Sequence, residues 1–371
     1  MIYLDHAATT PLRPEAAEAM EPFLRDRFGN TSGSHDISRR AKNALEEARE
    51  LAAELLGASP NELIFTSGGT ESDNLAIKGA ALPNRGGVVT VATEHEAVLE
   101  TGHFLERMGS KLDIIGVDQH GMVDLVRLEE TVGRHTAVVS VMTINNETGT
   151  QQPITRVVEA VKRSNPRTLV HTDAVQAFSS LDLTVDDLGV DLLSLAAHKF
   201  GGPQGVGLLY SRSGVNLEPL LHGGGQEYGR RSGTHNVAGV AGMAAATSAA
   251  AADRDRFRRE VGEARQAFEA KLSDRIERTV PEATSAPQHS HLRVGIENET
   301  LLVRLDHLGV AASAGSACQS GATTVSHVLS AMGLSKEQAR RSMRFTFGWT
   351  STTAEAEQAA QLVIQALEGH S

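Results

Sequence analysis

The sequence predicts an α/β protein with a mostly parallel, buried sheet, and the order of its apolar segments is the main reason. Between about residues 62 and 210, short apolar runs alternate with helix-like segments, the pattern of successive βαβ units. These runs occupy residues 62–66, 88–92, 112–117, 137–143, 168–172, 192–196 and 206–210. Because ligands of such sheets bind at the carboxyl ends of the strands, the ends of these runs are the first places to look for a site.

Helix signals and a change of pattern divide the rest of the chain. Residues 38–56 predict a helix ended by Gly57, and the Ala-rich residues 237–252 predict a buried helix packed closely against its neighbours. We place a domain change near Asp253, after which residues 253–282 are strongly charged and predict a further helix. The second pattern comprises apolar segments 286–294 and 301–310, a loop of small residues 312–322, a strand 342–347 and a last helix from about Thr353.

Composition narrows the class of function. The 371 residues suggest two or three domains at about 150 residues each, and 40% hydrophobic with 22% charged residues is typical of a soluble globular protein. The net charge of −11 argues against broad electrostatic binding to nucleic acid or to an anionic membrane. The N-terminus lacks the pattern of a secretory signal, and the longest uncharged stretch is too short to span a bilayer, so we expect a cytoplasmic protein.

The sequence predicts no metal site. Its single cysteine, Cys318, excludes an intrachain disulfide framework and any multi-cysteine zinc or iron–sulfur site. The histidines considered as ligands, His6, His35, His289, His291 and His327, lack a convincing metal-binding pattern.

A glycine turn at residues 67–70, Ser-Gly-Gly-Thr, separates a predicted strand from a predicted helix. Backbone N–H groups at the start of that helix, with the positive end of its dipole, form a ready anion site, although a plain turn has the same sequence. No dinucleotide or P-loop glycine motif is present. The similar run 201–207 leads into a strand and predicts only a turn.

An acid and an amine follow two other predicted strands. Asp173 ends one apolar run, and Lys199 follows another 26 residues later, a separation that suits one βαβ step and places both strand ends beside one cleft. An Asp at such a position is commonly a helix cap, and a lone His-Lys pair carries little information. With the glycine turn, however, they provide what pyridoxal phosphate requires: an amine for a Schiff base, a carboxylate for the ring nitrogen and an anion cradle.

Through these residues and others the chain resembles, from end to end, the group I cysteine desulfurases, pyridoxal-phosphate enzymes of the aminotransferase class V type. The matching motifs, in the family's order, are 3–11 (YLDHAATTP), 67–74 (SGGTESDN), 93–98 (TEHEAV), 145–149 (NNETG), 171–176 (HTDAVQ), 197–199 (AHK), 231–234 (RSGT), 315–318 (GSAC) and 344–348 (RFTFG). The resemblance implies the fold-type I architecture of these transferases. A large domain, residues 12–252, would hold a mostly parallel seven-stranded sheet, and residues 1–11 and 253–371 would form a smaller α+β domain with the catalytic cysteine loop.

The resemblance also implies a role for each site residue. Lys199 would hold the cofactor through a Schiff base and move protons, while Arg344 would grip the substrate carboxylate by a two-pronged contact. The phosphate of the cofactor would be bound by Gly69, Thr70 and His198 and, from the other subunit of a homodimer, by Thr234. The ring would be contacted at its nitrogen by Asp173, at its hydroxyl side by Gln176 and Asn146, and on its face by His95. Asn146 would also touch the substrate.

Some positions depart from the family's pattern or allow another interpretation. Ala196 stands where many relatives have a serine that donates to the phosphate, which predicts a lower cofactor affinity. Thr31 and Ala197 replace a usual proline and glycine without removing a reactive group. The alternative structural roles are a core histidine for His95, a surface charge for Arg344 and a helix cap for Thr234.

The implied reaction removes sulfur from L-cysteine, releases L-alanine and leaves a persulfide on Cys318, the only residue able to supply an attacking thiolate. Catalysis would also need Lys199 and His95. A lone cysteine is usually an inert buried thiol, but the small residues around Cys318 favour an exposed loop. The sulfur would pass to an acceptor protein of iron–sulfur cluster assembly or transfer-RNA thiolation.

Two other classes of function use the same fold. A selenocysteine lyase or an aminotransferase would share the cofactor site, and an aminotransferase would not need Cys318. A non-catalytic assembly partner is disfavoured because Lys199, Asp173, His95 and Arg344 are present together with Cys318.

Overall fold

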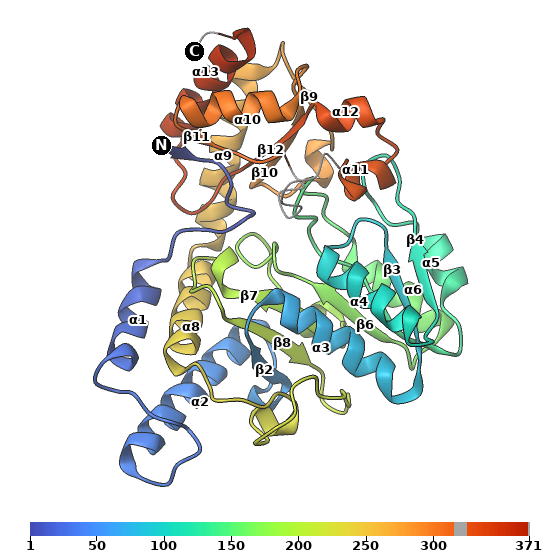
Figure 1. The fold of residues 1–371 in the computed structure, drawn as a ribbon, viewed down its shortest axis with the longest axis vertical. Helices are drawn as coiled ribbons and strands as arrows, with labels where there is room; N and C mark the ends of the chain where they lie inside the picture. The colour runs from blue at the N-terminus through green and yellow to red at the C-terminus, as the bar shows by residue number, and fades with distance from the viewer. Residues whose placement is uncertain (315–324, 370–371) are drawn as a thin grey trace.

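The computed structural model describes residues 1–314 and 325–369 and is built on a seven-stranded sheet (Figure 1). Its strands, in sheet order, are β2 (Leu63–Thr66), β8 (Gly207–Ser211), β7 (Leu192–Ala196), β6 (Leu169–Asp173), β5 (Thr136–Ser140), β3 (Gly87–Val91) and β4 (Leu112–Ile115). All neighbours pair in parallel except those of β8. The predicted α/β class with a mostly parallel sheet is therefore confirmed.

The direction of β8 follows from the length of chain before it. A parallel crossover needs a dozen or more residues, but only residues 197–206 connect β7 to β8. The chain therefore returns antiparallel, and β8 fills the space between β7 and β2. As predicted, the glycine-rich run 201–207 is the turn that makes this return.

Helices cover both faces of the sheet, and the alternation of strand side chains shows which helices lie on which face. On β5, Val138 packs with α3 (Gly69–Ala81) and α4 (Glu96–Arg107), while Val139 packs on the opposite side. The helices of that opposite side are α2 (Asp36–Leu56), α5 (Leu125–Thr131), α6 (Ile154–Ser164) and α8 (Val237–Ala252). Two further helices, α1 (Pro14–Leu24) and the short α7 (Val185–Leu188), complete residues 12–252.

The helix ends agree with their sequence signals. Helix α2 ends where Gly57 adopts the left-handed conformation at φ 65°. Helix α8 has the predicted bounds and packs directly on α1, where a side chain at Gly242 would collide with Met20. The close approach of these two helices requires the small residues that the sequence places there.

The C-terminal segment forms a second unit with its own core. Strands β12 (Ser342–Thr346), β10 (His289–Arg293) and β9 (Glu277–Arg278) make an antiparallel sheet. The helices around it are α9 (Arg254–Leu272), α10 (Asn298–His307), α11 (His327–Ala331), α12 (Lys336–Arg340) and α13 (Thr353–Glu368). At the N-terminus, β1 (Ile2–Tyr3) pairs in parallel with β11 (Val310–Ala311), and Leu4 joins the second core. On this basis we propose two domains, 12–252 and 1–11 with 253–371.

One predicted helix is too long. The charged segment 253–282 is helical only to Leu272, after which β9 pairs with β10. Ile276 and Val280 continue the four-residue apolar spacing of the helix, so the sequence pattern does not mark its end. Tertiary pairing decides the conformation because it satisfies the backbone of β9 and buries Val280.

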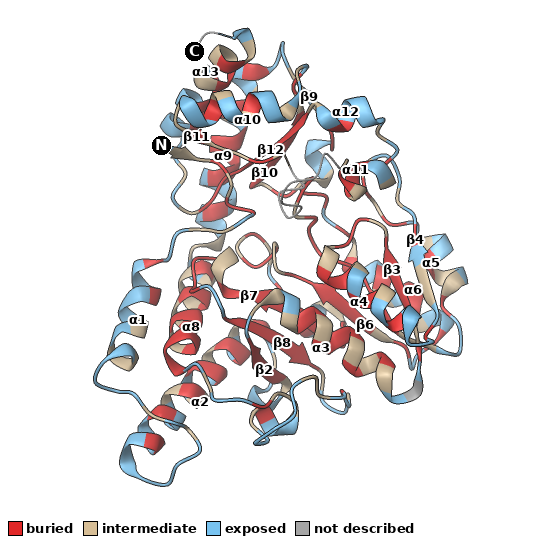
Figure 2. Cartoon of the chain, viewed as in Figure 1, coloured by how far each residue is buried: buried red, intermediate tan, exposed pale blue. Residues whose placement is uncertain are grey.

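Within the described ranges, no helix is both long and apolar enough to cross a membrane. Figure 2 shows that buried residues concentrate on the sheet and on the inner sides of the helices, while the connection between α1 and α2 is largely exposed.

A buried ion pair fixes an irregular segment to the edge of the sheet. The Arg49 guanidinium donates two hydrogen bonds of 2.8 Å to the Glu227 carboxylate, and both side chains are almost fully buried. Burial by itself raises the pKa of Glu227, but hydrogen bonds from His235 and Arg49 outweigh it and lower the pKa to about 2. These bonds hold Glu227 and Tyr228 in the left-handed region, at φ 49° and 57°, where non-glycine residues are strained.

We predict that Glu227→Gln lowers the free energy of unfolding by about 3 kcal/mol, because it removes the buried counter-charge of the Arg49 cation and leaves only the partly exposed Glu46. Urea unfolding followed by circular dichroism measures this loss. Glu46→Gln is the matched control, since Glu46 contacts the same guanidinium at 3.2 Å from a partly exposed position. Its cost should stay below about 1 kcal/mol. Equal losses for the two variants would contradict a special role of the buried pair.

Candidate active site

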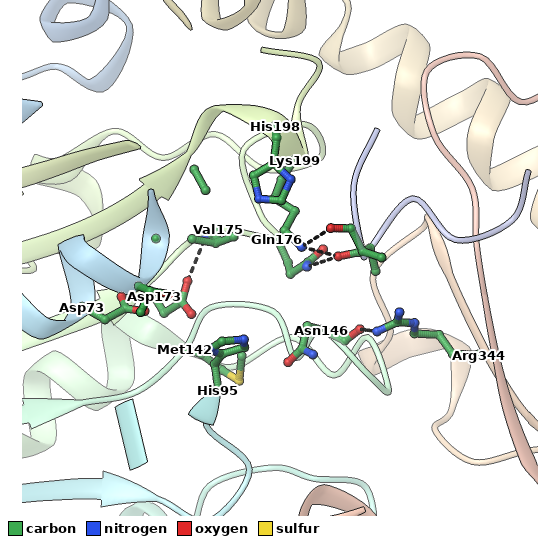
Figure 3. A pocket seen from close by; sticks show the side chains of 15 residues that line it. Asp73, His95, Met142, Asn146, Asp173, Val175, Gln176, His198, Lys199 and Arg344 are labelled. Carbon is green, nitrogen blue, oxygen red and sulfur yellow. Dashed lines mark hydrogen bonds between the residues drawn. The ribbon is translucent and has the colours of Figure 1, made fainter. Parts of the chain in front are cut away.

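A cavity of about 290 Å³ opens where β6 and β7 end, and it gathers residues from distant parts of the chain (Figure 3). The sequence-predicted residues that line it are Gly69, Thr70, His95, Asn146, Asp173, Gln176, His198, Lys199 and Arg344. Asp173 is the last residue of β6 and pairs with Ser194 of β7, while Lys199 ends the short helical turn that follows β7. The predicted meeting of these two strand ends at one cleft is thus seen in the fold.

The Lys199 amine lies against the N-terminal segment. Its Nζ donates hydrogen bonds to the carbonyl oxygens of Ala7 and Ala8, at 2.5 and 2.8 Å. The Gln176 side chain donates to the same Ala7 carbonyl at 2.9 Å. The segment after β1 therefore forms one wall of the cavity, although it is remote in sequence from both strands.

A buried carboxylate forms the floor of the cavity. Asp173 is 5% exposed, and its Oδ1 accepts a hydrogen bond of 2.8 Å from the backbone N–H of Val175. Burial raises the pKa of Asp173, whereas the nearby His95 and Lys199 lower it. A cationic ring nitrogen bound against this carboxylate would stabilise its ionised form further.

The start of α3 presents backbone N–H groups that suit an anion. The helix begins at Gly69, so the N–H groups of its first turn have no carbonyl partner within the helix. Gly68 has φ 153°, and its backbone lies so close to Gly207 that a Cβ at position 207 would be 2.6 Å from it. Glycine is needed at both positions for the turn to lie flat against β8.

His198 lines the cavity next to Lys199 (Figure 3). Its Nδ1 is 3.1 Å from the Thr9 hydroxyl, and burial followed by the charge of Lys199 lowers the pKa of His198 to about 4. The ring is therefore neutral at physiological pH and can donate or accept a single hydrogen bond on its other side. Ala196 also lines this part of the cavity, and its methyl group offers no donor.

His95 is held by the helix that it begins. Its Nδ1 accepts a hydrogen bond of 3.0 Å from the backbone N–H of Ala97 at the start of α4, so the neutral ring carries its proton on Nε2. In Figure 3 the ring lies between Asp173 and Asn146. A side chain fixed in this way can cover one face of a planar ligand.

Arg344 places a positive charge on the side of the cavity opposite Asp173 (Figure 3). Its Nη1 donates to the Asn146 carbonyl at 2.8 Å and its Nη2 to the Asp5 carboxylate at 2.7 Å. Its Nε has no hydrogen-bond partner within residues 1–314 and 325–369. This buried guanidinium is oriented by two fixed acceptors, so the surface-charge interpretation of Arg344 is wrong.

Two predicted site residues are not in the cavity. Thr234 is exposed on the segment before α8, away from the cavity of its own chain. Cys318 lies outside the described residues.

Sequence reasoning missed several contributors. Asp73, Met142 and Val175 line the cavity with Ala7 and Ala8. For Asp73 a signal was available, because it follows Thr70 by three residues on one helix and so shares its face. The pairing of Asp5 with Arg344 had no local signal, since 339 residues separate them.

The cavity satisfies the requirements of pyridoxal phosphate. A primary amine, a buried carboxylate, a glycine-rich helix start and the Arg344 guanidinium border one space. No group of three or more side chains suited to a metal ion occurs in the part of the chain that the structure describes.

Comparison with known proteins places these features in a family. The model of the family described as aminotransferase class V matches residues 2–358. The cysteine desulfurase IscS of Dictyoglomus turgidum is 45% identical over 95% of this chain and 90% of its own length. The putative cysteine desulfurase IscS 1 of Bacillus subtilis is 41% identical over 99% of this chain and 98% of its own.

Solved structures give the same result. A NifS-like protein, 36% identical, superposes with a TM-score of 0.93 over 99% of both chains. A structure described as SspA in complex with cysteine, 35% identical, has a TM-score of 0.84 and covers 94% of this chain and 99% of its own.

The buried Glu147 beside Asn146 makes stability depend on pH. Burial raises the pKa of Glu147 to about 7, although its hydrogen bond with Ser326 and the charge of Arg344 oppose this. The folded protein therefore binds a proton that the unfolded chain has released above about pH 4.5. This contribution is complete below pH 4.5 and is lost as the pH rises to about 7, at most about 3 kcal/mol.

We predict that Glu147→Gln removes this loss, so that the stability difference between variant and wild type grows in the variant's favour from pH 5 to pH 8. Urea unfolding at each pH measures it. Glu130→Gln, at an exposed position, should run parallel to the wild type. A pH-independent difference for Glu147→Gln would show that Glu147 is ionised in the folded protein.

Proposed function

The chain belongs to the aminotransferase class V family as a group I cysteine desulfurase that uses pyridoxal phosphate, and from this premise we propose that its sulfur is carried as a persulfide on Cys318. The observation that best supports the assignment of roles is the shared cavity of Lys199, Asp173 and Arg344. It combines a site for the cofactor with a site for an amino acid carboxylate.

The residues that would hold the cofactor are Lys199 through a covalent bond, Asp173 at the ring nitrogen, Gln176 at the ring hydroxyl, His95 on the ring face and Gly69, Thr70 and His198 at the phosphate. When bound, pyridoxal phosphate supplies an electron sink that makes the Cα proton of an amino acid removable. The missing hydroxyl at Ala196 leaves the helix start and His198 with a larger share of the phosphate contacts.

The chain's own groups would orient the substrate and move its protons. Arg344 would bind the cysteine carboxylate with the edge that Asp5 and Asn146 leave open. The Lys199 amine, once exchanged for the substrate amine, would take the Cα proton as a general base. The carbonyls of Ala7 and Ala8 offer a place for the resulting ammonium group.

Sulfur transfer needs one more group, and the single cysteine of the chain can provide it. The Cys318 thiolate would attack the substrate sulfur, forming an S–S bond while the C–S bond breaks and its electron pair remains with the substrate carbon. Protonation of that carbon, Cβ, and return of a proton from the Lys199 ammonium group to Cα complete L-alanine. In sum, L-cysteine and the enzyme thiol become L-alanine and the enzyme persulfide, with no external oxidant.

The persulfide would then be attacked by the thiolate of an acceptor protein. We propose an acceptor in iron–sulfur cluster assembly or transfer-RNA thiolation and a cytoplasmic site of action. The net charge of −11 favours a protein over nucleic acid as the direct recipient.

A homodimer with shared active sites is also proposed. Thr234 is exposed and does not line the cavity of its own chain. Its segment is nevertheless held in place, since Arg231 pairs with Glu71 of α3 at 2.8 Å. His235 hydrogen-bonds Thr31 at 2.8 Å, which links this segment to the connection between α1 and α2. Exposed apolar residues occur within or next to these two linked segments, namely Leu24, Phe28, Ile37 and Tyr228. A second copy of the chain is the occupant that would cover them.

We predict that Cys318→Ser lowers alanine formation by roughly a thousandfold or more, because a serine hydroxyl stays protonated and attacks sulfur poorly. The variant should still bind cysteine, seen as a change in cofactor absorbance. Lys199→Ala, as control, should lose both the covalent attachment and turnover. Alanine release by Cys318→Ser at the wild-type rate would replace the persulfide mechanism with a simple lyase or transaminase.

For the dimer, we predict that Thr234→Ala weakens cofactor binding about tenfold through loss of one hydrogen bond to a charged phosphate. Co-expression with Lys199→Ala gives mixed dimers that can be isolated with two affinity tags. If Thr234 acts across the interface, the intact Lys199 site of the mixed dimer regains wild-type cofactor affinity. If affinity stays weak there, Thr234 acts within its own chain or not at all.

A further inference from the structure

A second layer of buried polar groups lies behind Asp173. On β6, His171 points to the same face as Asp173 because strand side chains alternate, and that face is covered by α3. Asp73 of α3 meets His171 there, with 3.6 Å between its Oδ1 and the ring Nε2. Asp73 is 1% exposed and also borders the cofactor cavity, where Figure 3 shows it next to Asp173.

His171 cannot provide a positive charge for Asp73. Both its ring nitrogens are already engaged, Nδ1 with the Ser140 hydroxyl at 2.8 Å and Nε2 with the Ser194 hydroxyl at 2.9 Å. Burial lowers the pKa of His171 to about 3, so the ring is neutral. The contact between His171 and Asp73 is therefore not an ion pair, and Asp73 Oδ1 has no hydrogen-bond partner in the described structure.

Asp73, Glu94 and Asp173 form an acid cluster in which not every member can be ionised. Burial and then Asp173 raise the pKa of Asp73 well above its usual value; Ser194 opposes this and Glu94 adds to it. Burial and Asp173 likewise raise the pKa of Glu94 to about 8. Against the effect of burial, the Lys199 ammonium group and the His95 ring act on Asp173 and lower its pKa.

The charges around the acid cluster favour an ionised Asp173 and a protonated Asp73. Asp173 faces the positive groups and receives a backbone N–H, so it keeps the negative charge most easily. Asp73 faces a neutral histidine, a hydroxyl and two carboxyl groups, so a bound proton removes an unfavourable buried charge. The hydroxyl of a neutral Asp73 can then donate a hydrogen bond within the cluster.

We propose that Asp73 is a positioning residue that acts as a neutral carboxylic acid behind Asp173, leaving Asp173 as the ionised member of the acid cluster where the cofactor ring nitrogen binds. This inference rests on the proposed placement of the ring against Asp173, but the state of Asp73 can be measured without cofactor. In this proposal α3 has two roles. Its first turn would bind the cofactor phosphate, and Asp73, one turn later, would determine how many acids of the cluster beneath the cofactor ring are protonated.

The first test uses the cofactor-free protein. The infrared spectrum of wild type minus Asp73→Asn at pH 7 should show loss of the carbonyl stretch of one protonated carboxyl group. Because Asn is a neutral isostere with a hydrogen-bond donor, the fold should be kept, and circular dichroism checks this. Glu94→Gln is the matched control and should remove a separate protonated band. Loss of an ionised carboxylate band in Asp73→Asn would overturn the proposal.

The second test uses the loaded enzyme and the pH titration of its cofactor absorbance. Replacing a neutral acid by Asn should move the midpoint by less than about 0.3 pH unit, whereas removing a buried negative charge beside Asp173 would move it by about one unit or more. Asp73→Ala, which lacks the donor, should weaken cofactor binding about tenfold, and Asp73→Asn should restore it to within about twofold. A large midpoint shift, or no rescue by Asn, would contradict the neutral state.

These readouts separate the inference from the proposed function. The protonated band in the cofactor-free protein does not depend on Cys318 or on alanine formation. The band and the small midpoint shift would therefore persist even if Cys318→Ser kept its full activity.

Discussion

Burial of the Asp173 carboxylate at the end of β6 is the constraint on which the active site depends. A buried charge without compensation costs several kcal/mol, and burial does raise the pKa of Asp173. The surroundings stabilise one negative charge rather than three. His171 is neutral, and burial raises the pKa of the other two acids of the cluster, Asp73 and Glu94, which favours their protonated forms. In the proposed placement of the cofactor, a cationic ring nitrogen would complete this balance.

The N-terminal segment connects this electrostatic centre to the second core. Leu4 packs in the C-terminal core, and Asp5 pairs with Arg344. The next residues face the large sheet, because the carbonyls of Ala7 and Ala8 accept hydrogen bonds from Lys199. A short stretch of chain thus holds the Arg344 guanidinium and the Lys199 amine in a fixed relation. Movement of one core against the other would change both ends of the cavity together.

A different segment, which contains residues 227–234, is attached to the start of α3. The strained backbone at Glu227 and Tyr228 is held by the buried pair with Arg49, and Arg231 pairs with Glu71 in the first turn of α3. The segment that presents Thr234 to the outside is therefore anchored to the helix that begins at the anion site. This arrangement suits a residue that completes the phosphate site of a second copy.

By itself the sequence determined the α/β class, the C-terminal end of α2, both ends of α8 and nine of the residues that line the cavity, because these depend on local periodicity, on a capping glycine and on recognisable motifs. Only the tertiary structure decided the rest. It ended α9 at Leu272 by pairing β9 with β10, and it joined Asp5 to Arg344 across nearly the whole chain. It also placed Asp73 behind Asp173, where burial and mutual repulsion set which acid holds the proton. Strand register, long-range ion pairs and desolvation arise when distant segments pack together, so no window of sequence contains them.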